Sequence, residues 1–293
     1  MTYLILCILS STGIFLVFKV LDQKKLASFP VIILNYLVAS VLGFVINAEK
    51  IETKEILALP WIPISVLIGF LFIVMFFIIA RSSAEAGISI TTVASKMSVV
   101  FPISFSIYLE AEDSLNLLKG LAIASALIGV FLTVYSPKSL IKEKKRIFIP
   151  LILFLGMGLV DSLVKYAQYR YVSNDDSALF SAVLFAMAFL TGLMILPFRK
   201  QRVSEFRNRG IWIWGGILGI VNFGSIYLIV NALNHVNMHG VRIDSSVIYG
   251  ANNIGIVSLS VLAGLLLFKE KLNKYNWIGI SISFVAIILF SFA

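Results

Sequence analysis

Charged residues are scarce in this chain. Asp, Glu, Lys and Arg together make up 13% of its 293 residues, against about 25% in an average soluble protein. Hydrophobic residues make up 59%. A soluble fold of this length needs far more polar surface to cover its core. The composition therefore excludes a water-soluble globular protein and predicts a chain that lies in a lipid bilayer.

Cysteine is almost absent, and the common catalytic motifs are missing. The single Cys7 lies in an apolar segment, so no disulfide can form within the chain and redox chemistry is not expected. The sequence has no P-loop, no H-E-x-x-H and no G-x-S-x-G motif. His235 and His239 have metal-ligand spacing, but catalytic zinc takes three protein ligands and no third is near in the sequence. We therefore expect no catalytic residue, no metal and no cofactor.

The net charge of +9 does not indicate a nucleic-acid-binding surface. Lys and Arg are interleaved between apolar segments and do not gather on a globular domain. Such placement is typical of connectors that orient helices in a membrane. We therefore expect the lipid bilayer and a small-molecule substrate as partners, no nucleic acid, and either a monomer or a homodimer.

Ten apolar segments are long enough to span a bilayer, since a spanning helix needs about 20 mostly apolar residues. They cover residues 3–21, 29–46, 61–80, 88–109, 117–135, 148–169, 178–198, 211–231, 241–268 and 275–290. Most cations lie in the odd-numbered connectors, such as Lys138 to Arg146 after the fifth segment. Because cytoplasmic loops are enriched in Lys and Arg, we expect the odd connectors inside the cell and both termini outside.

The two halves of the sequence resemble each other. Glu110 and Glu270 each close a span, and a short polar turn then leads to Gly120 or Gly279 in a last apolar helix. Five helices are an odd number, so the second half would enter the membrane from the opposite side, as in many secondary transporters. The sequence thus predicts an all-α membrane protein of ten transmembrane helices in two inverted five-helix repeats, residues 1–136 and 147–293, joined by a basic connector, 137–146.

These features resemble the drug/metabolite transporter superfamily, in particular its EamA-like ten-helix branch. The E-x-L-N turn at Glu270 to Asn273, followed by Gly279, carries the resemblance, which covers the whole chain. The chain departs from the usual pattern where it has Ser11-Thr12-Gly13 instead of a Trp-Gly pair, and where Asn35 replaces an Arg. The resemblance implies transport of a small metabolite, often export.

The ninth predicted helix carries the richest set of polar side chains. Projected at 100° per residue, one arc holds Ser245, Ser246, Tyr249, Asn252 and Asn253. Such residues can hydrogen-bond between helices, but so many on one arc favour a water-filled cavity. We expect them to bind substrate.

The fourth predicted helix carries Lys96 near its middle, on the same face as Ser89 and Thr92. A Lys at this depth is either paired with an acid or binds an anion. We expect these three residues to face the arc of the ninth helix and to complete the substrate site.

The sixth and eighth predicted helices carry the remaining candidates. Asp161 and Lys165 have the i, i+4 spacing of an intrahelical ion pair, with Gln168 on the same face. A carboxylate at this depth could instead carry a proton. On the eighth helix, Gly215 and Gly219 predict close helix packing, and Asn222 is placed to reach the cavity.

The function expected from the sequence is secondary transport of a small polar metabolite by alternating access, with export as the direction. An amino acid or another carboxylate-bearing compound is the preferred substrate, because cations outnumber acids if Asp161 and Lys165 neutralise each other. A phosphorylated-sugar or nucleotide-sugar exchanger is the alternative. A membrane-embedded enzyme is disfavoured, because no nucleophile with a base is found. The expected location is the bacterial cytoplasmic (inner) membrane.

Overall fold

The structure is a computed structural model that describes residues 2–48, 58–109, 116–135, 145–172, 177–198, 203–234 and 245–292. At 106–109, 145–147, 177, 203, 233–234 and 245–247 only the backbone is described. His235 and His239, Glu110 and most of the basic connector 137–146 lie outside the described residues.

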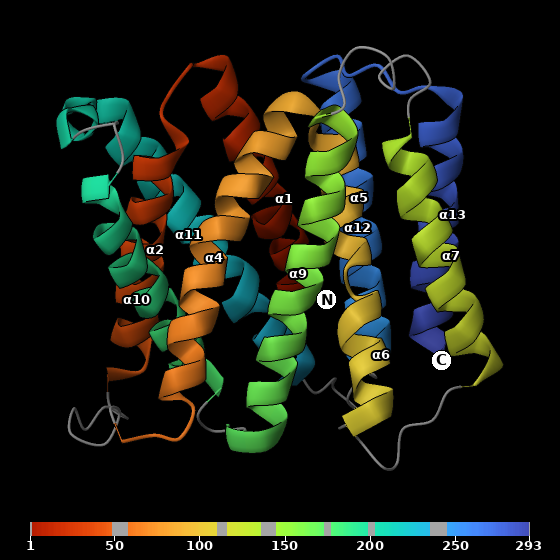
Figure 1. The fold of residues 1–293 in the computed structure, drawn as a ribbon, viewed down its shortest axis with the longest axis horizontal. Coiled ribbons are helices and arrows are strands. Elements are labelled where there is room, and N and C mark those ends of the chain that lie inside the picture. Colours follow the sequence, from red (N-terminus) through yellow and green to blue (C-terminus); the bar gives the residue numbers. More distant parts are fainter. Residues whose placement is uncertain are drawn as a thin grey trace.

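The described residues form helices and turns, with no strand among them. The helices are α1 (Thr2–Gln23), α2 (Ser28–Ile46), α4 (Ile62–Glu85), α5 (Ile88–Met97), α6 (Val100–Leu109), α7 (Leu117–Val134), α9 (Lys145–Tyr171), α10 (Ser177–Ile195), α11 (Arg209–Asn234), α12 (Ser245–Leu266) and α13 (Lys274–Phe292). Two short 3-10 turns, η3 (Leu196–Phe198) and η4 (Val203–Arg207), precede α11. The helices run side by side in one bundle (Figure 1).

Within the described residues, ten helical segments are long and apolar enough to cross a membrane, as the sequence predicts. Large apolar side chains also cover the outside of the bundle: Phe131 is 61% exposed and Leu266 is 74% exposed. A water-soluble protein rarely exposes so much contiguous apolar surface. The described helices therefore form an integral, multi-pass membrane protein.

The fourth spanning segment is not one continuous helix. It divides into α5 and α6 at Ser98 and Val99, in the middle of the range 88–109 that the sequence predicts as a single helix. Pro102 explains the break, because proline has no N–H to donate to the carbonyl four residues earlier and its ring clashes with it. The Ser98 carbonyl oxygen instead accepts a hydrogen bond from Phe101 N, only three residues later, at 3.0 Å.

Small residues let pairs of helices approach closely. A Cβ added to Gly215 or Gly219 of α11 would lie 2.6 Å from the Cβ of Leu34 or Val38 on α2. The close packing predicted from Gly215 and Gly219 is thus confirmed. Inside a bilayer such backbone contact, and not hydrophobic expulsion from water, holds helices together.

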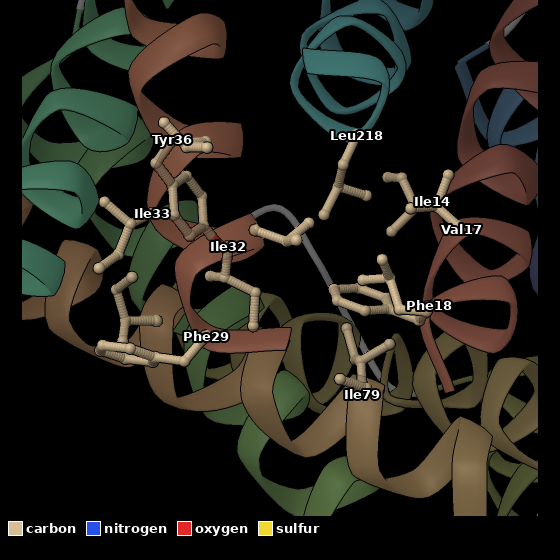
Figure 2. Packing of buried hydrophobic residues seen from close by; sticks show 14 of the residues in the cluster. Ile14, Val17, Phe18, Phe29, Ile32, Ile33, Tyr36, Ile79 and Leu218 are labelled. Atoms are coloured by element: carbon tan, nitrogen blue, oxygen red, sulfur yellow. The ribbon is translucent and has the colours of Figure 1, made fainter. Parts of the chain in front are cut away.

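The largest apolar core lies where α1, α2, α4 and α11 meet. Phe18 and Ile14 of α1, Ile32 of α2, Ile79 of α4 and Leu218 of α11 point toward one another (Figure 2). Aromatic rings extend this core, with Phe18 and Phe76 packed edge to face at 5.7 Å between centroids. The core forms a rigid wall beside the cavity described next.

Candidate functional site

A cavity of about 190 Å³ opens among α1, α2, α4, α5, α9, α10 and α11. Its apolar lining is largely aromatic: Phe15, Tyr36, Phe72, Phe76 and Phe185, with Ile14, Ile79, Met157 and Ile226. Its polar lining is Ser11, Ser95, Lys96, Asp161, Asn222 and Ser225. The cavity therefore combines one cation, one acid and a few neutral polar groups with an aromatic wall.

The aromatic wall is held in place by its own contacts. The Tyr36 ring lies parallel to Phe72 at 6.2 Å and within 5.1 Å of Phe76, measured between ring centroids. The Tyr36 hydroxyl donates to the Phe72 carbonyl oxygen at 3.1 Å. Because its hydroxyl already has a partner, Tyr36 offers the cavity mainly the face or edge of its ring.

Lys96 reaches the cavity from the last turn of α5. It interacts electrostatically with Asp161 of α9, but in the described part of the chain the two form no direct ion pair, and Lys96 donates no hydrogen bond there. The carbonyl end of a helix favours a nearby cation, so the end of α5 also stabilises the Lys96 ammonium. Lys96 is thus placed to bind an anionic group from the cavity.

Asp161 contributes the acid of the cavity lining, from α9. Its carboxylate Oδ2 lies 3.1 Å from the Ser98 hydroxyl, and its charged neighbour is Lys96 on another helix. The charged group that acts on Asp161 is Lys96, and the intrahelical pairing of Asp161 with Lys165 stays a prediction. Lys165 is half-buried, and Gln168 is exposed and outside the cavity lining.

Asn222 lies on the cavity wall and is buried. Its side-chain nitrogen is 3.1 Å from the side-chain amide of Asn35 on α2, which also lies 3.1 Å from the Leu218 carbonyl oxygen. The Asn35 side chain on α2 thereby contacts the Asn222 side chain. Asn35 was noted in the sequence only as a departure from the family pattern, and nothing in the sequence alone paired it with Asn222.

The polar arc predicted on the ninth span does not line this cavity. Tyr249 is 48% exposed, Asn252 is buried, and neither they nor Asn253 contribute to the lining. Helix α12 packs against α1, α5 and α13, and the substrate-binding role of its polar residues stays a prediction. The side chains of Ser245 and Ser246 lie outside the described residues.

Ser89 and Thr92 share a helix with Lys96 but not its surroundings. The backbone nitrogen and hydroxyl of Ser89 both bond to Glu270 Oε2, at 3.2 and 2.8 Å. The Thr92 hydroxyl is buried with no hydrogen-bond partner among the described residues. Ser89 therefore anchors the helix, and neither residue lines the cavity.

Glu270 holds the amino end of α5 from the turn before α13. Its Oε1 accepts from Ile88 N at 2.6 Å, which adds a third bond to the two from Ser89. A carboxylate at this position satisfies backbone N–H groups that have no partner inside the helix. In the sequence, Glu270 marks the repeat and begins the E-x-L-N turn that carries the family resemblance. Its role was not deduced because the helix it holds is distant in the sequence.

Clusters of acidic, histidine or cysteine side chains can also bind a metal ion. Within the residues that the structure describes, no group of three or more His, Cys, Asp and Glu side chains is placed to hold a metal ion.

Comparison with known proteins supports a transporter family. Residues 147–292 match the EamA-like transporter family. An uncharacterized protein of Haemophilus influenzae is 26% identical over 291 residues, covering 97% of this chain and 95% of that protein. One solved crystal structure aligns with a TM-score of 0.57 at 15% identity, covering 97% of this chain and 96% of that chain, which shows a shared fold. Ten spanning helices are consistent with the drug/metabolite transporter superfamily. Through residues 147–292, this chain belongs to the EamA-like transporter family.

Proposed function

We propose that the chain is a secondary transporter of a small amino acid with an apolar side chain. One observation carries the proposal: a cavity at bilayer depth presents one ammonium group, Lys96, and one carboxylate, Asp161, beside an aromatic wall. Ionisable side chains within membrane spans are rare and mark substrate or ion pathways.

The two ends of an amino acid match the two charged groups. The substrate carboxylate would bind Lys96, and its ammonium would bind Asp161. Asn222 and the serine hydroxyls are placed to orient these groups, as the few polar residues of a small-molecule site do. The substrate side chain would lie against Phe72, Phe76 and Phe185.

The size and charge of the cavity favour an amino acid over a phosphorylated sugar or a nucleotide sugar. Its volume of about 190 Å³ lies below the roughly 300 Å³ at which pockets for drug-sized ligands begin. Lys96 is the one cation in the described lining, and a doubly charged phosphate would leave excess negative charge beside Asp161.

Helix packing supports transport by alternating access between two inverted repeats. Helices at corresponding positions of the two halves pack on each other: α2 on α10, α5 on α12 and α7 on α13. Further contacts come in matched pairs, with α1 on α11 and α9 on α4. Rocking of one half against the other around a central site would then expose the cavity to each side in turn.

The family match also favours transport over an enzymatic reaction. The cation, the acid and the amides are suited to hold a zwitterion without changing it covalently. Export across a bacterial inner membrane is the direction and location that we propose.

Purified protein in liposomes tests the proposal. Uptake of radiolabelled L-leucine and L-phenylalanine into liposomes preloaded with the same amino acid should exceed uptake into empty liposomes, and Lys96→Met should abolish the excess. The exposed Lys24→Met variant is the matched control. Uptake of glucose 6-phosphate without amino acid uptake would support the alternative exchanger, and a covalently altered solute would indicate an enzyme.

A further inference from the structure

The Ser98 hydroxyl lies within hydrogen-bond distance of two oxygen atoms, each of which can accept its one hydrogen. Ser98 Oγ is 2.6 Å from the Ser95 carbonyl oxygen and 3.1 Å from Asp161 Oδ2. A serine hydroxyl carries one hydrogen, and an ionised carboxylate and a carbonyl can only accept. With Asp161 ionised, one hydrogen would have to serve both acceptors.

A protonated Asp161 satisfies all three oxygens. The Ser98 hydroxyl then donates along the shorter contact to Ser95, and the Asp161 carboxyl donates to Ser98 Oγ. Ser95 lies in the last turn of α5, where carbonyl groups run out of backbone partners within the helix. The bond from Ser98 therefore closes the end of α5, directly before the break at Ser98 and Val99.

From this geometry we infer that Asp161 and Ser98 form a proton-binding site that controls the break between α5 and α6. When Asp161 releases its proton to water in the cavity, its carboxylate can only accept hydrogen bonds. It then accepts the hydrogen bond of the Ser98 hydroxyl. Ser95 then loses its bond, and the end of α5 is released. The covalent changes are the breaking of the Asp161 carboxyl O–H bond and the formation of an O–H bond on the water that takes the proton.

The charges around Asp161 leave room for this exchange. Of the helices packed on α9, α5 contributes Lys96, which interacts with Asp161 without direct contact. Helix α4 contributes Arg81 and Glu85, which pair with each other at 2.8 Å. Helix α7 carries Lys119 near its own amino end, and α6 has no described Asp, Glu, Lys or Arg. On α9 itself, Lys165 lies one turn further on.

The consequence for transport rests on the proposed function. A substrate ammonium and a proton would compete for the same carboxylate, so binding of one would release the other. A proton gradient could then drive transport of the amino acid. Each exchange of a proton for a substrate ammonium would change the hydrogen bonding at the end of α5, the helix that carries Lys96.

Infrared difference spectroscopy of the purified protein tests the proton site without any substrate. Wild-type protein, taken from acid to alkaline pH within the range where circular dichroism shows a folded protein, should lose a protonated-carboxyl C=O band. Asp161→Asn should lack that band, and Ser98→Ala should shift its frequency because the bonded hydroxyl is gone. The exposed Asp22→Asn and the nearby Ser104→Ala, whose hydroxyl donates to Val100 O at 2.7 Å, should leave the band unchanged.

Two results would overturn the inference. One is a spectrum with no band that depends on Asp161 at any pH, which would mean that Asp161 stays ionised. The other is a band that Ser98→Ala leaves in place. If Asp161→Asn does not fold, Ser98→Thr compared with Ser98→Ala decides, since threonine keeps the hydroxyl and should preserve the frequency. Absence of amino acid uptake would refute the proposed function and leave this result intact.

Discussion

Lys96 is a single ammonium group near the middle of a membrane span, and its surroundings decide what it can do. Its interaction with Asp161 runs across the cavity and not through a direct ion pair in the described structure. A charge left facing lipid at this depth costs about 2.5–3.5 kcal/mol on insertion scales. The cavity provides polar surroundings and leaves the ammonium free to bind a ligand.

Replacement of Lys96 by methionine should weaken amino acid binding. A hydrogen bond to a charged group contributes about 1.5–3 kcal/mol, so the Kd should rise roughly 10- to 100-fold. Isothermal titration calorimetry with L-leucine measures this, with folding checked by size-exclusion chromatography. Unchanged affinity in a folded variant would make Lys96 a structural residue.

For two asparagines, Asn222 and Asn253, the sequence and the structure predict different effects on substrate binding. Asn222→Ala should weaken binding because its amide lines the cavity, whereas Asn253→Ala should leave the Kd unchanged because Asn253 is outside the lining. The same titration compares the two. A loss of affinity in Asn253→Ala equal to that in Asn222→Ala would show that α12 contributes to the substrate site.

Helical periodicity could predict which side chains share a face, and it selected Lys96, Asp161 and Asn222, all of which line the cavity. It could not predict which helix lies opposite that face. Tyr249, Asn252 and Asn253 lie outside the lining of this cavity, and their place in one site with Lys96 stays a prediction. The partner of Asp161 was also missed, because a hydrogen bond to Ser98 depends on a break in a different helix.

At the scale of elements, α5 depends on a side chain from the far end of the sequence. Glu270→Ala removes three bonds to the amino end of α5, and loss of a helix cap costs about 0.5–2 kcal/mol. A lower melting temperature in detergent should follow. Glu85→Ala is the control, because its partly exposed pair with Arg81 contributes about 0–1 kcal/mol. An equal loss in both variants would argue against the cap.

The contact between α2 and α11 gives a second test at this scale. Gly219→Ala places a methyl group 2.6 Å from Val38 Cβ, and overpacking costs about 1–3 kcal/mol. Gly216→Ala meets nothing within 4 Å and should be neutral. Thermal unfolding in detergent compares the pair, and the contact is unimportant if both variants melt with the wild type.

Most helices could be predicted from the sequence, because apolar length alone defines a membrane span. The break at Ser98 and Val99 was missed although Pro102 is visible in the sequence. Proline is tolerated in many membrane helices, where neighbouring groups satisfy the freed carbonyl. In this chain Pro102 lies in the first turn of α6, directly after the break.

At the scale of the whole molecule, the orientation in the membrane is open to direct measurement. If the odd connectors are cytoplasmic, a cysteine at Glu143 should resist a membrane-impermeant maleimide added to intact cells. A cysteine at Asp113, in an even connector, should react. The native Cys7 is buried and gives no background. Labelling of position 143 and not of 113 would reverse the assigned orientation.

The two ends of α5 are held differently. At its amino end Gly87 has a φ of 97°, and a Cβ there would lie 2.7 Å from Glu270 Oε1, so only glycine fits the joint. At its other end the chain is already broken. Ten residues make a rod of about 15 Å. One end of this rod is held by Glu270 and the other does not continue as a helix, so a tilt of α5 would move the Lys96 ammonium with it.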